Sequence, residues 1–313
     1  MRILITGGAG FIGHNLVKLA LDADHEVRVL DDLSNGYRDN LDGLDVDFRE
    51  ASLLDEGAVA SAVSGIDSIV HLGALGSVPR SIKDPLRTHH ANATGTLMLL
   101  DQARRAATNH VMCASSSSVY GMNPALPKGE REWVRPMSPY AVSKLATEQY
   151  VLAYQQSFEF DTLAFRFFNV YGPGQRAGHV YAAVIPTWIN AILKDQPVWI
   201  NGDGTNSRDF TYVGTVCAVL LDAVQRRVTH PEPVNLAFGT NTTLRHLTDE
   251  LRDIHGSTFE VRHRDPRQGD VPHSQAENST LRKLFPSVSP TELHSGLDST
   301  YTWFTEGASQ LPQ

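Results

Sequence analysis

The chain has 313 residues, of which 41% are hydrophobic, and its formal net charge is -8. This length predicts roughly two domains and a core that needs neither disulfides nor a metal to be stable. The acidic balance argues against binding to nucleic acid or to an anionic membrane, and no apolar run approaches the ~20 residues of a membrane-spanning helix. Glycines interrupt the apolar N-terminal stretch at once, so we expect no signal peptide and a cytoplasmic protein.

Segments typical of strands and helices alternate along the first half of the chain. Strands are predicted at residues 2–6, 26–30, 45–49, 68–72, 110–114 and 161–166, and helices at residues 11–21, 56–64, 92–106 and 140–156. This alternation favours an α/β protein with a doubly wound parallel sheet.

After residue 169 the pattern loosens into loops rich in Gly and Pro, which indicates a second, smaller lobe. We therefore expect residues 1–169 to form the sheet domain and residues 211–236 to return to it. Residues 170–210 and 237–305 are expected to form the C-terminal substrate-binding lobe, and residues 306–313 a tail.

The sequence GGAGFIG at residues 7–13 lies between the first predicted strand and the first predicted helix. Its glycines permit a tight turn and close approach of a pyrophosphate, and the helix N-terminus attracts phosphate groups. Asp31 ends the second predicted strand, at the spacing expected of a carboxylate that holds the adenosine ribose hydroxyls. Because this carboxylate would repel a 2′-phosphate, the sequence predicts NAD rather than NADP, bound to a Rossmann-type sheet.

Tyr140 and Lys144 lie four residues apart, on one face of a predicted helix. The lysine ammonium would stabilise a tyrosine phenolate, which would accept a proton from a sugar hydroxyl near neutral pH. Four serines at residues 115–118 follow the strand predicted at 110–114, at the sheet edge where α/β sites form. One serine hydroxyl there would bridge the substrate and the tyrosine, while loop or capping roles stay open for the others.

Further segments resemble the extended short-chain dehydrogenase/reductase family, specifically its nucleotide-sugar epimerases and dehydratases. They lie at residues 71–81, 92–96, 138–140, 166–169, 202–210 and 267–271, and the resemblance extends from Gly7 to about Trp303. The stretches ALGSVPRS, MNPALPK and YAAVIP resemble the bacterial UDP-N-acetylglucosamine 4-epimerase group in particular. The resemblance implies NAD, a UDP-sugar substrate and a homodimer whose four-helix interface uses the helices at residues 92–106 and 140–156.

The resemblance also implies catalytic roles. Tyr140 would be the base, Lys144 its electrostatic partner and a ligand of the cofactor ribose, and Ser116 the hydroxyl that binds the reacting oxygen, with Ser117 assisting. The residues expected to contact the cofactor are Gly7, Gly10, Phe11, Ile12, Gly13, Asp31, Asp32, Ser34, Asn35, Gly36, Ser52, Leu53, Leu72, Gly73, Ala74, Asn92, Ser115, Tyr140, Lys144 and Phe167.

For the sugar nucleotide, the resemblance implies that Arg208 and Arg267 bind the diphosphate, to which forked guanidinium donors are suited. A small residue at Ser274 is expected to admit a 2-acetamido group. The full expected substrate set is Gly76, Ser77, Val78, Ser116, Ser117, Tyr140, Asn169, Ala183, Val184, Trp188, Trp199, Asn201, Arg208, Arg267, Asp270 and Ser274.

The fate of a 4-keto sugar divides this family. In its 4,6-dehydratases an Asp-Glu pair follows the active-site threonine, whereas Ser117 and Ser118 occupy those positions here, and serine is a poor general acid or base. We therefore expect 4-epimerisation of UDP-GlcNAc to UDP-GalNAc. The alternative is 5,6-dehydration of the kind used in tunicamycin-type antibiotic biosynthesis, in which Tyr140 or the thiol of Cys113 would have to move protons.

Two residues depart from the epimerase pattern, since Ser52 replaces an adenine-contacting Asp and Met122 replaces a polar residue. A non-catalytic NAD-sensing protein is a distant alternative, which the Tyr-Lys pair disfavours. No metal site is predicted, because a calcium loop starting at Asn201 would lack Gly at its sixth position and Glu at its twelfth, which is Tyr212, and no HExxH motif is present.

Overall fold

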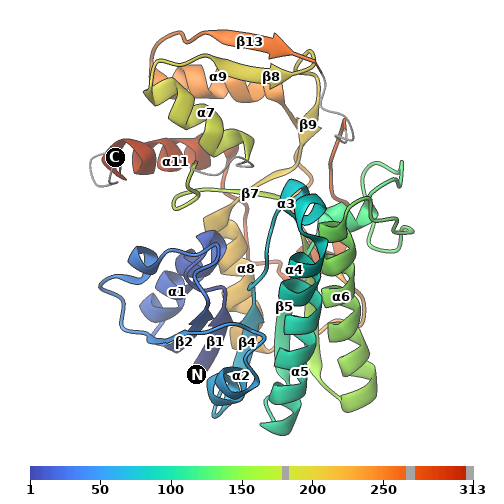
Figure 1. The fold of residues 1–313 in the computed structure, drawn as a ribbon. Helices are drawn as coiled ribbons and strands as arrows, with labels where there is room; N and C mark the ends of the chain where they lie inside the picture. The colour runs from blue at the N-terminus through green and yellow to red at the C-terminus, as the bar shows by residue number, and fades with distance from the viewer. Residues whose placement is uncertain (178–182, 266–271, 308–313) are drawn as a thin grey trace.

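The computed structural model describes residues 1–177, 183–265 and 272–307. Its centre is a seven-stranded parallel sheet in the order β11-β6-β5-β4-β1-β2-β3 (Figure 1). The strands are β1 (Arg2–Thr6), β2 (Glu26–Asp31), β3 (Asp47–Glu50), β4 (Ser68–His71), β5 (His110–Ser116), β6 (Asp161–Phe167) and β11 (Val234–Leu236). The strand order changes direction between β1 and β4, so the carboxyl edge there is the expected place for a ligand. The predicted doubly wound parallel α/β fold is confirmed.

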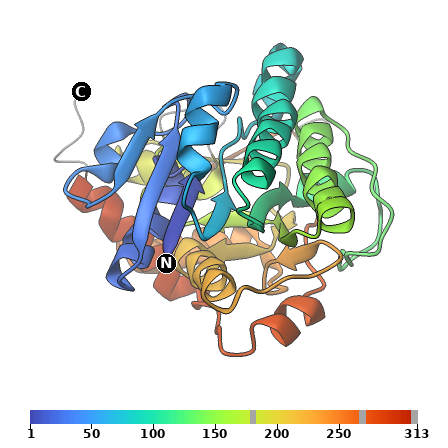
Figure 2. The same ribbon diagram turned by 90° about the horizontal axis from the view of Figure 1, so that it is seen from below.

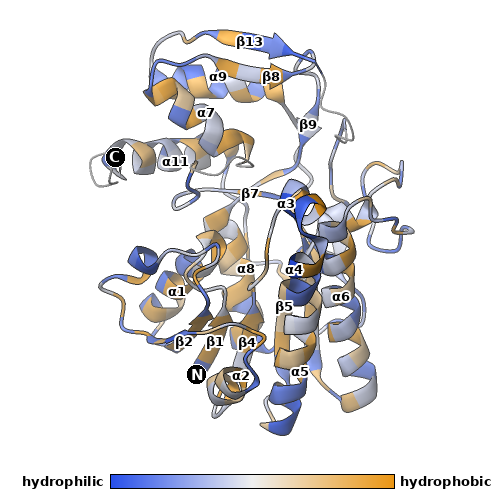
Figure 3. Cartoon of the chain, in the orientation of Figure 1, coloured by the Kyte–Doolittle hydropathy of each residue, from blue (hydrophilic) through white to orange (hydrophobic). Residues whose placement is uncertain are grey.

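Helices cover both faces of this sheet, as the view from below shows (Figure 2). They are α1 (Phe11–Asp22) and α8 (Val213–Arg226) on one face, and α2 (Glu56–Val63), α5 (Gly95–Arg105) and α6 (Pro139–Phe158) on the other. Side chains such as Ile5 and Leu4 alternate between the two cores. The strands are therefore hydrophobic along their length (Figure 3), because a parallel sheet is buried on both faces. Within the described ranges, no helix combines the length and the apolarity that crossing a membrane requires.

The second lobe stands over the carboxyl edge of the sheet (Figure 1). It contains α7 (Val184–Leu193), β8 (Val198–Asn201), α9 (Leu244–His255), β13 (Val261–Arg264) and α11 (Leu293–Gly307). Its own core includes Trp188, Ile189 and Leu247. Shorter elements are η1 (Arg38–Leu41), α3 (Val78–Lys83), α4 (Pro85–His89), η2 (His90–Thr94), η3 (Ser117–Tyr120), β7 (Asn169–Tyr171), β9 (Ser207–Arg208), β10 (Phe210–Tyr212), β12 (Thr242–Thr243) and α10 (Ser279–Leu284).

Several boundaries differ from the sequence predictions. The third strand begins two residues later than predicted, and α11 continues through Gly307, beyond the predicted start of the tail. The helix predicted at residues 92–106 begins inside the π-helical turn η2, which precedes α5. In this wider turn the Asn92 side chain pairs with the Leu75 backbone, accepting from its N–H at 2.7 Å and donating to its carbonyl at 3.3 Å. Apolar periodicity alone does not reveal such a change of helical pitch.

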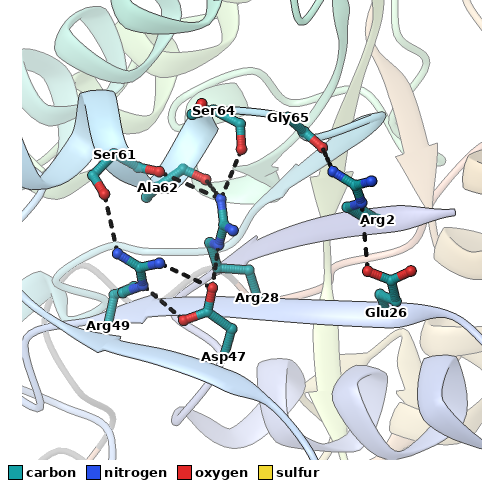
Figure 4. Close-up of polar contacts among 9 residues, drawn as sticks. All are labelled: Arg2, Glu26, Arg28, Asp47, Arg49, Ser61, Ala62, Ser64 and Gly65. Carbon is teal, nitrogen blue, oxygen red and sulfur yellow. Dashed lines mark hydrogen bonds and ion pairs between the residues drawn. The ribbon is translucent and has the colours of Figure 1, made fainter.

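Ion pairs and hydrogen bonds connect strands β2 and β3, at one edge of the sheet, to helix α2 (Figure 4). Arg28 donates to the carbonyl oxygens of Ala62 and Ser64, each at 2.9 Å, at the carboxyl end of that helix. The same guanidinium binds Asp47 at 2.6 Å, and Arg49 binds the other oxygen of that carboxylate at 2.7 Å. Hydrogen bonding from Arg49, reinforced by Arg28, lowers the pKa of Asp47 to about 2. A cation at a helix C-terminus also complements the helix dipole.

Candidate active site

The glycine-rich turn between β1 and α1 brings several backbones unusually close together. Gly7 has a φ of +71°, and a Cβ atom there would lie 2.7 Å from the backbone nitrogen of Gly73. A Cβ at Gly13 would lie 2.1 Å from the Gly7 carbonyl oxygen. Only glycine fits these contacts, and the first-turn N–H groups of α1, which have no partner within the helix, remain available for an anion.

A cavity of about 530 Å³ lies over the carboxyl ends of the strands beside this turn. All of the predicted cofactor residues except Asn92 line it. Asn92 is buried behind the wall, where its side chain donates to the Ser143 hydroxyl at 2.9 Å. It therefore supports the cavity from outside rather than facing it. The glycine cradle and the cavity together fit a dinucleotide.

Asp31 stands at the end of β2 with both carboxylate oxygens anchored. One oxygen accepts from the backbone N–H of Ala9 and the other from that of Leu33, each at 2.9 Å. Burial raises the pKa of Asp31, and these two hydrogen bonds oppose the rise. The carboxylate is thereby fixed between the glycine turn and the loop after β2, on the cavity wall where the sequence predicted a ribose ligand.

Tyr140, Lys144 and Ser116 all line the cavity at its other end. The helix that carries the first two begins at Ser138, whose hydroxyl accepts from the backbone N–H of Ala141 at 3.1 Å. Burial raises the pKa of Tyr140, which a hydrogen bond with Ser116 partly offsets. The ammonium of Lys144 is buried and donates to the Ala114 carbonyl at 2.7 Å, and burial lowers its pKa to about 8.

A second cavity of about 920 Å³ continues from the first into the smaller lobe. Both cavities share the wall residues Phe168, Val170, Gln175 and Ala183. The predicted substrate residues that line this second cavity are Asn169, Ala183, Val184, Trp188, Trp199, Asn201 and Arg208. A ligand in the second cavity would therefore adjoin the first cavity, whose wall includes Tyr140.

The remaining predicted substrate residues are placed differently. Gly76 and Ser77 line the first cavity together with Ser116 and Tyr140, whereas Arg267 and Asp270 lie outside the described residues. Three others line neither cavity: Val78, Ser117 and Ser274. Val78 begins α3 and is 39% exposed, Ser117 is the first residue of η3, and the Ser274 backbone N–H donates to the carbonyl of Ser207 at 3.1 Å.

The sequence reasoning missed four polar residues on the wall of the first cavity: Tyr37, Arg80, Gln175 and Arg176. Arg176 binds Asp39 at 2.6 Å, and its guanidinium carbon lies 3.9 Å from the centre of the Tyr37 ring. Arg80 lies within residues 71–81, one of the segments that resemble the epimerase and dehydratase family. The sequence therefore contained a signal that could have identified Arg80 as a site residue. The contact of Arg176 with the loop after β2 joins distant parts of the chain, and no local pattern predicts it.

Below the serines, a buried ion pair joins the catalytic helix to the sheet. The Ser115 hydroxyl donates to Glu148 at 2.7 Å, and Arg166 binds the same carboxylate through two nitrogens at 2.7 and 2.9 Å. The two charged side chains are only 0% and 4% exposed. Burial opposes the charge on Arg166, but the hydrogen bonds and charge of Glu148 outweigh it and raise the pKa of the guanidinium.

These features define a dinucleotide-binding α/β enzyme with a tyrosine and a lysine at the end of its cofactor cavity. Residues 3–237 match the NAD dependent epimerase/dehydratase family, so the chain belongs to that family. The match confirms the resemblance seen in the sequence and the dependence on NAD. Among the described residues, no group of three His, Cys, Asp or Glu side chains is arranged to hold a metal ion.

Individual relatives are similar over nearly their whole length. A UDP-glucose 4-epimerase of Mycolicibacterium smegmatis is 34% identical, over 97% of this chain and 98% of the relative. The structure of a UDP-N-acetylglucosamine 4-epimerase from Methanobrevibacter ruminantium, in complex with UDP-N-acetylmuramic acid, has 35% identity and a TM-score of 0.92, covering 97% and 98% of the two chains. TunA, an NAD-dependent NDP-hexosamine 5,6-dehydratase involved in tunicamycin biosynthesis, has 30% identity and a TM-score of 0.88, with the same coverage.

The buried ion pair yields a prediction with a defined pH dependence. Arg166→Met would leave Glu148 buried without its partner and lower the free energy of unfolding by about 3–5 kcal/mol. The isolated carboxyl would have a raised pKa in the folded state, so the loss should grow as pH rises above the ordinary glutamate value of about 4.3. Urea unfolding at pH 5.5 and pH 8 measures it.

The matched control is the double variant Arg166→Met/Glu148→Leu, which removes both charges and should recover most of the stability at pH 8. A loss in Arg166→Met that is the same at both pH values, or a double variant no more stable than the single one, would contradict this account of the pair.

Proposed function

We propose that the protein epimerises UDP-N-acetylglucosamine at C4 to give UDP-N-acetylgalactosamine, through a transient 4-keto sugar. The observation that supports this proposal is the position of the cavity carboxylates relative to Tyr140. Among the described residues that line the two cavities, the carboxylates are Asp31 and Asp32, at the end of β2. Tyr140 lies near the end of β5, three strands away, which at a strand spacing of about 4.8 Å is roughly 14 Å. Within residues 1–177, 183–265 and 272–307, no carboxylate pair able to drive elimination therefore lines the cavity beside the tyrosine.

The chemistry needs one group to take and return the hydroxyl proton on O4. Tyr140 is suited to this role, since it shares the cavity with Ser116, to which it is hydrogen-bonded. Lys144 adds a buried positive charge that favours the phenolate form. NAD, when bound, supplies the acceptor and later the donor for the C4 hydride. Loss of the O4 proton and the C4 hydride gives the ketone, and their return with hydride on the opposite face gives the epimer.

A UDP-N-acetylhexosamine suits the space around these groups. A Cβ atom built at Gly76 meets no other atom within 4 Å, which leaves room beside Ser77 for a 2-acetamido group. Arg208 on the wall of the second cavity would bind the diphosphate. Arg267 and Asp270 remain proposed nucleotide ligands, and Ser274 the proposed small residue behind the sugar. The relative from Methanobrevibacter ruminantium is named as a 4-epimerase of UDP-N-acetylglucosamine, which is a substrate of this kind.

A second candidate is 5,6-dehydration of the same substrate, favoured by the similarity to TunA. In that reaction a proton must leave C5 and the C6 oxygen must depart with one. Cys113 is 1% exposed and does not line either cavity, and burial raises the pKa of its thiol to about 12. Of the two groups that the sequence predicted for this proton transfer, Tyr140 lines a cavity and Cys113 does not, which disfavours this candidate.

We also propose a homodimer formed through α5 and α6. On α6, Val142 is 53% and Tyr150 38% exposed. The short helices α3 and α4, which pack against α6, add Ile82 and Leu86 at 67% and 70% exposure. Exposed apolar side chains on helices that pack against one another are a feature expected of a protein interface.

Proton NMR of UDP-GlcNAc incubated with the NAD-loaded enzyme in D₂O tests the reaction. We expect UDP-GalNAc signals with the C5 hydrogen retained, whereas vinylic signals of an exocyclic C5–C6 alkene would overturn epimerisation in favour of dehydration. Tyr140→Phe should lower the rate by about 10²–10⁴-fold, the usual contribution of a general acid–base. Tyr301→Phe, a tyrosine on α11 that lines neither cavity, is the matched control and should react at the unaltered rate.

Sedimentation velocity tests the dimer. The unaltered protein should sediment with twice the mass of one chain, and Leu86→Asp together with Val142→Asp should convert it to a monomer with the same circular dichroism spectrum. A monomer in the unaltered protein at micromolar concentration would refute the proposed interface.

A further inference from the structure

The cofactor cavity must accommodate a diphosphate in a protein whose net charge is -8. The charged residues on its wall are Asp31, Asp32, Arg80, Lys144 and Arg176. The two aspartates would repel the diphosphate, so the three cations decide the local balance. A dinucleotide diphosphate carries negative charge that a buried site must compensate with donors or cations.

Two of these cations already have partners. Arg176 is ion-paired with Asp39 at 2.6 Å, which neutralises it. Lys144 donates to the Ala114 carbonyl beside the reactive tyrosine, at the end of the cavity that the sugar would enter. Arg80 forms no ion pair with any carboxylate of the described chain. Of the two arginines on the described wall, Arg80 is therefore the one whose charge no carboxylate compensates, while Lys144, which also lacks an ion pair, is already hydrogen-bonded beside the tyrosine.

The position of Arg80 is fixed by the loops around the cavity. The Ser77 hydroxyl accepts from the Arg80 backbone N–H at 3.2 Å at the start of α3. One guanidinium nitrogen donates to the side-chain oxygen of Asn35, and Asn35 in turn donates to the Ala74 carbonyl at 3.3 Å. The guanidinium therefore spans from the loop after β4 to the loop after β2, over the cavity that both loops line.

The same loop connects Arg80 to the phosphate cradle. The Gly73 backbone, at the start of the loop after β4, lies against the glycine turn at Gly7, where a Cβ would come within 2.7 Å. Four residues further on, Ser77 begins the turn that holds Arg80. Only one donor of the guanidinium is used within the described protein, so the others are available to phosphate oxygens.

We propose that Arg80 is a binding and positioning residue for the cofactor, whose guanidinium binds the diphosphate oxygens of NAD while Asn35 orients it. It complements the α1 N-terminus, which offers backbone N–H groups but no full charge. Because Ser77 both caps Arg80 and lines the cavity near Tyr140, the same contact links cofactor binding to the loop that faces the sugar.

Binding constants of the NAD-free protein test this proposal without recourse to turnover. The dissociation constants for NAD, for ADP-ribose, which keeps the diphosphate, and for adenosine, which lacks it, are measured by calorimetry and ligand-observed NMR. Arg80→Met should weaken NAD and ADP-ribose about 10- to 100-fold, the effect of losing a charged hydrogen bond, and leave adenosine within about twofold. Arg80→Lys should restore part of the loss, because it keeps the charge without the fork.

The matched control is Arg87→Met, which removes an exposed arginine from the neighbouring helix α4 and should bind all three ligands normally. Unchanged NAD affinity in Arg80→Met would overturn the proposal. Equal weakening of adenosine and ADP-ribose would also overturn it, because that result means Arg80 only supports the shape of the cavity.

Discussion

The close contact between the glycine turn and its surroundings is the constraint on which the rest of the site depends. Because no side chain intervenes at Gly7 or Gly13, helix α1 packs directly onto the turn and points its N-terminus into the cavity. The same contact sets the path of the loop after β4, which contains Gly73 and leads into α3, the helix that carries Arg80. A negatively charged protein can thus bind an anionic cofactor, since the attraction comes from local groups and not from net charge.

At the other end of the cavity, burial governs the chemistry. It raises the pKa of Tyr140 and lowers that of Lys144 to about 8, so both shifts oppose the charged forms that proton abstraction needs. The hydrogen bond from Ser116 favours the phenolate, as would the positive nicotinamide ring of bound NAD. The buried pair of Glu148 and Arg166 holds α6, the helix that carries Tyr140 and Lys144, against strands β5 and β6. The charge states of Tyr140 and Lys144 therefore depend on whether NAD is bound in the cavity.

The sequence predicted those features that arise from local patterns. The glycine turn, Asp31 at the end of a strand, and Tyr140 with Lys144 on one helix face follow from spacing alone, and all four line one cavity. The alternation of strands and helices likewise predicted the parallel sheet. The second lobe has no comparable periodic signal, and its substrate-binding residues were predicted from the resemblance to a family.

What the sequence did not predict depends on contacts between distant segments. Asn92 lies behind the cavity wall because a π-helical turn directs its side chain to Leu75. Ser117 leaves the cavity because a 3-10 turn starts there. Arg80 and Arg176 reach the cofactor cavity only through long-range contacts with the loop after β2, whose partners cannot be read from spacing.

The central claim, that one cavity removes a hydride from C4 and returns it to the same carbon, is tested most directly with UDP-GlcNAc deuterated at C4. The account predicts that UDP-GalNAc formed in ordinary water retains the deuterium at C4, because the label never leaves the site. Replacement of the label by hydrogen from solvent, or its appearance at C6 of a 4-keto-6-deoxy sugar, would contradict it.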